Sequence, residues 1–210
     1  NLESRLLLHR INYENGTIVL DGKQYTMKDM YFPTVDPADP YRLSAEETAI
    51  MKRLEQAFLN CEKLQQHMRF LLSKGSLYKV YNKNLLYHGC MPLCEDGKLK
   101  EVKICGELCK GRQLYDVLES YIRRGFLAED AAERKKGRDL MWYIWLGEHS
   151  PLFGKDKMAT FERYFLADRE SHTEKKNSYY RYLEDEKTAD MILAEFGLQG
   201  EDSHIINGHM

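Results

Sequence analysis

The stretch that says most about the fold is LYKVYNKNLLYHG, residues 77–89. Two runs of apolar and aromatic residues, Leu77–Tyr81 and Asn84–His88, lie on either side of Asn82-Lys83. Two such runs separated by two residues predict an antiparallel hairpin with a tight turn. His88-Gly89 then marks a change from strand to loop, so we expect the His88 side chain at the rigid end of a strand.

Two further β segments lie far from this hairpin in the sequence. Thr17–Leu20 is followed by Asp21-Gly22, a strong two-residue turn signal, and by Gln24–Met27, which predicts a second hairpin. Near the other end, His204-Ile205-Ile206-Asn207-Gly208-His209 predicts a short strand that gives way to a loop at Gly-His. His88 and His209 therefore share one setting, the end of a short apolar strand beside a glycine.

A long helix is predicted after three prolines, between residues 33 and 40, that rule out regular hydrogen-bonded structure. Ser44 and Glu47 form a capping box at its start, and Gly75 stands where a helix should stop. Apolar residues recur between them at intervals of three and four, at Ile50, Leu54, Phe58, Cys61, Leu64, Met68 and Leu72. We expect this apolar face, including its methionines, to pack in the core.

Three more helices are predicted, at Gly111–Arg124, Lys157–Phe165 and Tyr179–Glu195, the last one stopped by Gly197. Glu129–Arg138 is highly charged and should form a solvated surface, whereas the aromatic-rich Met141–Trp145 should be buried. These elements predict a mixed α and β fold. A length of 210 residues favours one full-sized core over two small domains.

Composition narrows the class of protein. A formal net charge of -2 implies no nucleic acid or other polyanion as partner. No apolar run approaches the roughly 18 residues that a membrane helix requires. Five cysteines in a chain of this size do not resemble a secreted disulfide scaffold, so we expect a reducing cytoplasm.

The two strand-end histidines are candidates for metal binding, because neutral imidazole is a common ligand of divalent transition metals. One histidine in such a place is more often structural or merely exposed. Two in the same context favour a metal role for His88 and His209.

Several blocks of the sequence resemble class III fructose-1,6-bisphosphatases. Residues 84–92, NLLYHGCMP, resemble the family segment NLLFHGCIP, and residues 204–209 resemble its HIINGH segment. Further similar blocks are residues 32–37, 62–71, 142–145, 150–155 and 158–165. The resemblance covers nearly all 210 residues, in order.

This resemblance implies a hydrolase of the calcineurin-like metallophosphatases, whose fold is a β-sandwich flanked by helices. The chain would be an internal piece of one catalytic domain, residues 1–210, with a helical insertion at residues 29–75. The implied reaction is hydrolysis of the 1-phosphate of fructose 1,6-bisphosphate in gluconeogenesis, with two Mn²⁺ ions. The substrate would thus be a small sugar bisphosphate, and the sequence leaves a homo-oligomer open.

The same resemblance implies that His88 and His209 are metal ligands. The other ligands of the superfamily come from Asp-x-His, Gly-Asp-x-x-Asp-x-Gly and Gly-Asn-His-Asp/Glu, none of which occurs in this sequence. We expect these motifs upstream of Asn1 in a longer parent, and we expect this chain by itself to be inactive.

Phosphate groups also need cationic or amide donors. Arg163 and Lys155 are the candidates for contacts with the substrate phosphate. The alternative for each is a surface salt bridge, for which Glu162 and Glu148 are available partners.

A different class of function rests on four cysteines, paired as Cys90-x-x-x-Cys94 and Cys105-x-x-x-Cys109. Four thiolates could hold a structural zinc, which would make the chain a non-catalytic helical binding or scaffolding module. The usual zinc knuckle is C-x-x-C, so the wider spacing favours free thiols.

Overall fold

The computed structural model describes residues 5–208, and contacts divide the chain into two compact units. The first consists of Asn1–Gly75 and Ala159–Thr173, and the second of Ser76–Met158 and Glu174–Met210. Each unit mixes helices with small sheets, which confirms the predicted fold class. That the chain is one piece of a metallophosphatase catalytic domain, with an insertion at 29–75, stays a prediction.

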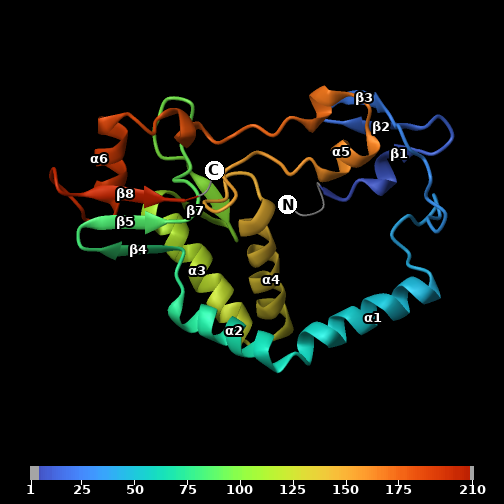
Figure 1. The fold of residues 1–210 in the computed structure, drawn as a ribbon, viewed down its shortest axis with the longest axis horizontal. Coiled ribbons are helices and arrows are strands. Elements are labelled where there is room, and N and C mark those ends of the chain that lie inside the picture. Colours follow the sequence, from blue (N-terminus) through green and yellow to red (C-terminus); the bar gives the residue numbers. More distant parts are fainter. Residues whose placement is uncertain (1–4, 209–210) are drawn as a thin grey trace. The chain divides into compact units, whose positions relative to one another are not determined.

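The first unit contains an antiparallel sheet of β1 (Ile11–Asn12), β2 (Thr17–Leu20) and β3 (Lys23–Thr26) (Figure 1). The predicted hairpin is confirmed, because β2 pairs with β3 across Asp21-Gly22. Both turn residues have positive φ, 52° and 78°, as the tight turns that suit twisted strands require.

The core of this unit is small and apolar. One side chain reaches it from beyond α5 (Thr160–Phe165): Leu166, which is fully buried. The other members are Leu7, Ile11, Ile18, Leu20 and Met27. The helix predicted at Lys157–Phe165 is present but begins three residues later. A 3₁₀ helix, Arg169–His172, follows it.

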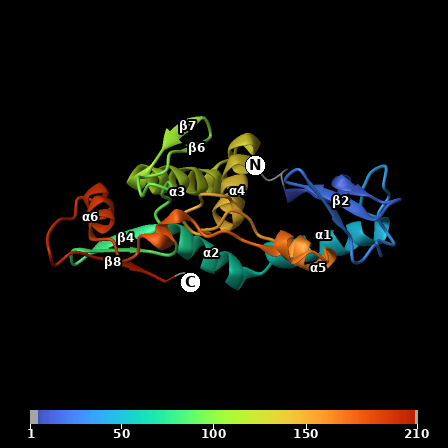
Figure 2. The same ribbon diagram turned by 90° about the horizontal axis from the view of Figure 1, so that it is seen from above.

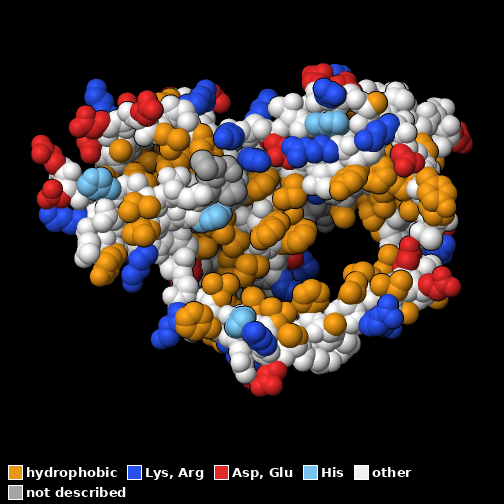
Figure 3. All heavy atoms as spheres, in the orientation of Figure 1, with side chains coloured by type: hydrophobic (Ala, Val, Ile, Leu, Met, Phe, Trp, Pro, Cys, Tyr) orange, Lys and Arg blue, Asp and Glu red, His pale blue; other side chains and the backbone are white. Residues whose placement is uncertain are grey.

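The predicted long helix is two helices, α1 (Ala45–Leu59) and α2 (Glu62–Lys74), interrupted at Asn60 and Cys61. The capping box of Ser44 and Glu47 and the stop at Gly75 are both confirmed. The predicted core packing is wrong, because neither helix contains a buried residue. Figure 3 shows hydrophobic side chains exposed along both helices. Periodicity identified the apolar face but could not say what covers it.

The second unit contains the sheet β4-β5-β8, built from β4 (Tyr78–Tyr81), β5 (Asn84–Tyr87) and β8 (His204–Asn207). The predicted hairpin is confirmed: β4 and β5 are antiparallel, and Asn82 and Lys83 both have positive φ in the turn. The predicted strand at β8 is confirmed as well. It pairs with β5 in parallel, from Asn84 opposite His204 to Tyr87 opposite Asn207.

Two helices pack side by side in this unit, α3 (Gly111–Leu127) and α4 (Ala131–Leu146) (Figures 1 and 2). A Cβ added to Gly125 would lie 2.5 Å from the Gly137 Cα, so the two glycines allow the backbones to approach closely. The helix predicted at Gly111–Arg124 is confirmed and extends three residues further.

Two expectations for this unit need correction. Met141–Trp145 lies on α4 with Trp142 52% and Trp145 66% exposed, so its predicted burial is wrong except at Ile144. Aromatic content does not fix which side of a helix faces the core. The helix predicted at Tyr179–Glu195 is a 3₁₀ helix, Ser178–Arg181, followed by α6 (Glu186–Glu195) with Asp185 as its N-cap.

A short hairpin, β6 (Val102–Ile104) and β7 (Glu107–Cys109), was not predicted from the sequence. The core of the unit gathers around Tyr115, which is completely buried, with Tyr87 and Tyr179 beside it. None of the described helices is both long and apolar enough to cross a membrane.

Candidate functional site

The parallel pairing of β5 with β8 brings two distant glycine-flanked segments to one edge of the sheet. The strands end in register at Tyr87 and Asn207, and the next backbone groups are also joined. The Gly208 N–H donates to the His88 carbonyl oxygen over 3.2 Å. The segment that leads into His209 therefore lies beside His88. His209 itself falls outside the described residues, and its role as a metal ligand stays a prediction.

A side chain from β8 fastens the loop that follows His88. The Asn207 Nδ2 donates to the Gly89 carbonyl oxygen over 2.9 Å. The carbonyls of His88 and Gly89 thus both accept from the end of β8, while the His88 residue is exposed. These two hydrogen bonds join the residues after β5 to the end of β8.

A third segment, residues 150–154, packs against this loop. The Cys90 N–H donates to the Pro151 carbonyl oxygen over 2.8 Å. A Cβ on Gly89 would lie 2.3 Å from the same oxygen, which explains why a glycine stands there. Fully buried Ser150 shapes the segment: its Oγ donates to the Ile144 carbonyl and accepts from the Leu152 N–H.

Buried tyrosines in the core of the second unit hold the loop through hydrogen bonds. The Tyr115 hydroxyl donates to the Cys90 carbonyl oxygen, and the Tyr87 hydroxyl donates to the Tyr179 hydroxyl, both over 2.8 Å. Burial raises the pKa of Tyr115 and of Tyr87 well above the ordinary value, so both remain protonated donors.

The four cysteines, all within the described residues, do not lie together as the zinc site of the alternative interpretation would need. Burial raises the pKa of the Cys90 thiol to about 12, which disfavours the thiolate that binds metal. Cys109 is also buried, whereas Cys94 is half-buried and Cys105 exposed, and all four are free. Within residues 5–208, no three histidine, cysteine or acidic side chains come together as a metal site would need.

That observation also bears on the metal centre implied by the resemblance. The exposed imidazole of His88 suits one ligand position on a first-row divalent ion. The described residues do not complete a two-metal site, because no carboxylates gather around it. The chain therefore fits as the source of some ligands and not of all.

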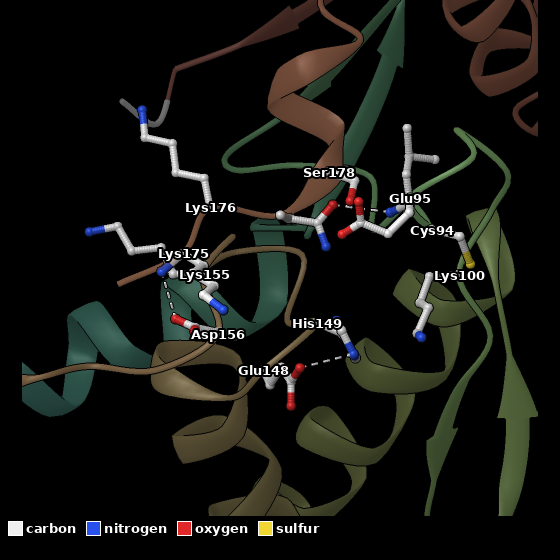
Figure 4. Close-up of a pocket in the computed structure, with 12 residues that line it drawn as sticks. Cys94, Glu95, Lys100, Glu148, His149, Lys155, Asp156, Lys175, Lys176 and Ser178 are labelled. Carbon is white, nitrogen blue, oxygen red and sulfur yellow. Dashed lines mark hydrogen bonds and ion pairs between the residues drawn. The ribbon is translucent and has the colours of Figure 1, made fainter. Parts of the chain in front are cut away.

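Lys155 lies in an open hollow of the second unit, shown in Figure 4. Its Nζ forms a 2.8 Å salt bridge with Glu174, rather than with Glu162 or Glu148. The hollow is lined by Leu93, Cys94, Glu95, Lys100, Glu148, His149, Lys155, Asp156, Lys175, Lys176, Asn177 and Ser178.

Arg163 belongs to the first unit, where it lies exposed on α5. Its neighbour Glu162 is 1% exposed. Each carboxylate oxygen of Glu162 accepts a 3.1 Å hydrogen bond from the Arg5 Nη2. Phosphate contacts by Arg163 and Lys155 stay predictions.

Sequence reasoning proposed His88 as a ligand but missed the contacts that hold its loop. Asn207 and Pro151 stand in the blocks that carry the family resemblance, yet nothing in their neighbours reveals their partners in the loop. The lysines at 100, 175 and 176 were missed as well, because charged surface residues carry no sequence signal that tells which ones share a hollow.

Comparisons with known proteins agree with the resemblance. The family model described as Firmicute fructose-1,6-bisphosphatase matches residues 1–210. Curated relatives named fructose-1,6-bisphosphatase class 3 are 52% identical in Clostridium botulinum (strain Langeland), 51% in Clostridium acetobutylicum and 50% in Clostridium novyi. Each match covers all of this chain but only 31–32% of the relative, so the chain spans about a third of their length. No solved structure matches the chain.

Proposed function

The chain belongs to the Firmicute fructose-1,6-bisphosphatase family, and from this we propose that it is one part of an enzyme that hydrolyses the 1-phosphate of fructose 1,6-bisphosphate. The product would be fructose 6-phosphate, the reaction would belong to gluconeogenesis, and the enzyme would work in the cytoplasm. The relatives' name supports this phosphoric monoester hydrolase activity, and the present chain corresponds to about a third of such a protein.

Within that enzyme, we assign His88 and His209 one ligand nitrogen each in a two-metal Mn²⁺ centre. The observation that carries this assignment is the parallel register of β5 and β8, with the Gly208 N–H bonded to the His88 carbonyl. When bound, the two cations would clamp the phosphate, supply a hydroxide nucleophile and stabilise the leaving oxygen. The residues of this chain would hold two neutral imidazoles in place at the sheet edge.

Two imidazoles do not suffice for such a centre. Two divalent cations carry four positive charges, and holding them close together requires anionic ligands. The described residues offer no carboxylate cluster around His88. The resemblance assigns those ligands to motifs that these 210 residues lack, so we expect the chain alone to release no phosphate.

Lys155 and Arg163 are proposed as contacts to substrate phosphate. The salt bridge between Lys155 and Glu174 does not exclude this role, because a phosphate dianion can compete for a partly exposed ammonium. Arg163 is exposed and carries the forked donor geometry that matches phosphate oxygens.

The test measures release of inorganic phosphate from fructose 1,6-bisphosphate with Mn²⁺ present. It compares the full-length protein, the 210-residue chain, and full-length variants His88→Ala and His204→Ala. His204 is the matched control: it is an exposed histidine at the opposite end of β8. We expect activity in the full-length protein and in His204→Ala, and none in the chain alone.

For His88→Ala we expect a loss of more than about a hundredfold, since even residues that only orient metal ligands are worth 10–100-fold. Bound manganese, measured by elemental analysis, should fall in parallel. Full activity and full manganese content in His88→Ala would overturn the ligand assignment. An inactive full-length protein would overturn the proposed function itself.

A further inference from the structure

The helices α1 and α2 carry an apolar stripe that the core of their own unit does not use. Neither helix contains a buried residue, and none of their residues belongs to the hydrophobic core of the first unit. The large apolar side chains that are between 47% and 63% exposed along the stripe are Ile50, Met51, Leu54, Phe58 and Leu71.

The spacing of the stripe is that of a helix packed against protein. Seven of its residues follow one another at alternating intervals of four and three: Ile50, Leu54, Ala57, Cys61, Leu64, Met68 and Leu71. This is heptad spacing. Met51, Phe58 and Leu72 widen the stripe on one side to three positions in seven. That width is typical of a helix that faces a protein interior, whereas a two-stranded coiled coil needs only two positions in seven.

The break between the helices leaves them connected. Cys61 departs from helical geometry with ψ 95°, and α2 begins at the next residue. The Gln65 Nε2 donates across the break to the Phe58 carbonyl oxygen over 3.2 Å, and the Gln65 N–H donates to the Cys61 carbonyl oxygen over 3.0 Å. The two helices thus run end to end and present their apolar residues over one extended length of chain (Figure 1).

The stripe is large for a surface that contacts only water. A large apolar side chain presents on the order of 150–250 Å². Because about half of that is exposed at each of the five residues above, the stripe amounts to roughly 500 Å². The largest apolar patch on a soluble monomer is about 300–600 Å², and patches of this size usually mark a contact surface.

The comparisons point to the same polypeptide as the occupant. The match to the Clostridium botulinum relative runs through both helices, because it covers all of this chain, yet it covers only 31% of the relative. About two thirds of a full-length protein of this kind therefore lie outside these 210 residues. A segment of the same chain reaches the stripe at a high effective concentration and loses no translational freedom on docking.

Other occupants fit less well. A second copy would bury less than the roughly 800 Å² per partner of a standard interface, and the stripe is wider than a coiled-coil seam. A lipid surface favours helices whose polar face is rich in lysine and arginine. Here the first turn of α1 is acidic, with Glu46 and Glu47, while the last turn of α2 carries Lys74.

We propose that the stripe of α1 and α2 is the docking surface for the part of the full-length protein outside these 210 residues, which covers it with an apolar face of its own. The two helices would then join this chain to the remainder of the molecule through a shared core. The proposal concerns the assembly of the full-length protein and holds whether or not that protein hydrolyses the bisphosphate.

The experiment measures how fast thiols on the helices of the purified full-length protein react with N-ethylmaleimide. Native Cys61 is one probe, because it is exposed in the present structure. Ala57→Cys and Ala49→Cys are a matched pair: both alanines are exposed on α1, but only Ala57 belongs to the stripe. Ala49 shares its helical position with Gln56 and Lys63. Mass spectrometry of peptides gives the rate at each site, relative to the protein unfolded in urea.

We expect the Ala49→Cys thiol to react nearly as fast as in urea. Cys61 and the Ala57→Cys thiol should react at least about a hundredfold more slowly, as groups do that are reached only when a packed surface opens. This protection should be the same over about a hundredfold range of protein concentration, because the covering segment is tethered.

Two results would overturn the proposal. Fast labelling of both Cys61 and the Ala57→Cys thiol, equal to that of the Ala49→Cys thiol, would show that the stripe stays open in the full-length protein. Protection that disappears on dilution would show that a second copy covers it. If Ala57→Cys prevents folding, Cys61 in the unmodified protein gives the same measurement.

Discussion

Replacing Gly89 with alanine tests how tightly the strand-end loop is built. The added Cβ would lie 2.3 Å from the Pro151 carbonyl oxygen and 2.7 Å from that of Leu152, whereas ordinary contacts begin at 3.4 Å. Both obstacles are backbone atoms of a packed segment and cannot rotate away. The Pro151 segment would have to retreat by about 1 Å in an interior that is close-packed.

The cost has two parts. Overpacking of this kind costs about 1–3 kcal/mol. The retreat also stretches the 2.8 Å bond from the Cys90 N–H to the Pro151 carbonyl. Leaving a buried N–H unpaired costs a further ~1–3 kcal/mol. The lower backbone entropy of alanine in the unfolded chain offsets only about 0.4–1 kcal/mol. We therefore expect a net loss of roughly 1–5 kcal/mol.

Gly208→Ala is the matched control, because a Cβ on that strand-end glycine would meet nothing within 4 Å. Urea unfolding followed by tryptophan fluorescence reports on this unit alone, since both tryptophans, Trp142 and Trp145, lie on α4. We expect Gly208→Ala to change the free energy of unfolding by less than about 0.5 kcal/mol. A Gly89→Ala variant as stable as this control would refute the packing of the loop against Pro151.

Five other predictions concern stability, pH dependence, kinetics and metal content. Tyr87→Phe should lower the free energy of unfolding by about 1–2 kcal/mol, because it breaks a buried hydroxyl pair. Tyr180→Phe should cost nothing, because its buried hydroxyl has no hydrogen-bond partner among the described residues; equal losses in urea unfolding would contradict this. Burial lowers the pKa of His149 against the raising effect of the Glu148 carboxylate, and the charge of Lys100 lowers it further, so stability should be full above pH 6.5 and fall as pH drops through the folded-state pKa. His149→Gln should flatten that slope, and an unchanged slope would count against it. Arg163→Lys should lower kcat/KM of the full-length enzyme about tenfold with no change in melting temperature, whereas unchanged kinetics would favour a surface salt bridge. Finally, a chelator should leave the melting temperature of the 210-residue chain unchanged, and one zinc per chain would restore the zinc-stapled alternative.

Local chemistry explains which parts of the fold were predictable. Asp21-Gly22 and Asn82-Lys83 adopt positive φ in two tight turns, and the residues on either side need no distant partner to be recognised as strands. The capping box of Ser44 and Glu47 likewise joins groups three residues apart. Such signals are complete within a short window of sequence.

Packing partners were not predictable from such windows. The apolar stripe of α1 and α2 has the right period, yet none of its residues is buried in the described structure. Trp142 and Trp145 are exposed on α4 although an aromatic cluster favours burial. In each case the pattern identifies a surface, and only tertiary structure determines what lies against it.

The candidate site divides in the same way. His88 could be placed at a strand end from its own neighbours. Its approach to the segment before His209 depends on a parallel pairing of β5 and β8 across more than a hundred residues, and that register has no local signature. The bond from Asn207 to Gly89 depends on the same register.

The hydrogen bonds around His88 bear on how it could serve as a ligand. The carbonyls of His88, Gly89 and Cys90 accept from Gly208, Asn207 and Tyr115, and the Cys90 N–H donates to Pro151. The backbone from His88 to Cys90 is thus held on several sides, while the His88 residue remains exposed. A ligand whose backbone is already ordered loses little conformational freedom when it binds an ion. The proposed affinity of His88 for an ion would therefore depend on residues that never touch the ion, and loosening Asn207 or Pro151 would weaken it without removing a ligand atom.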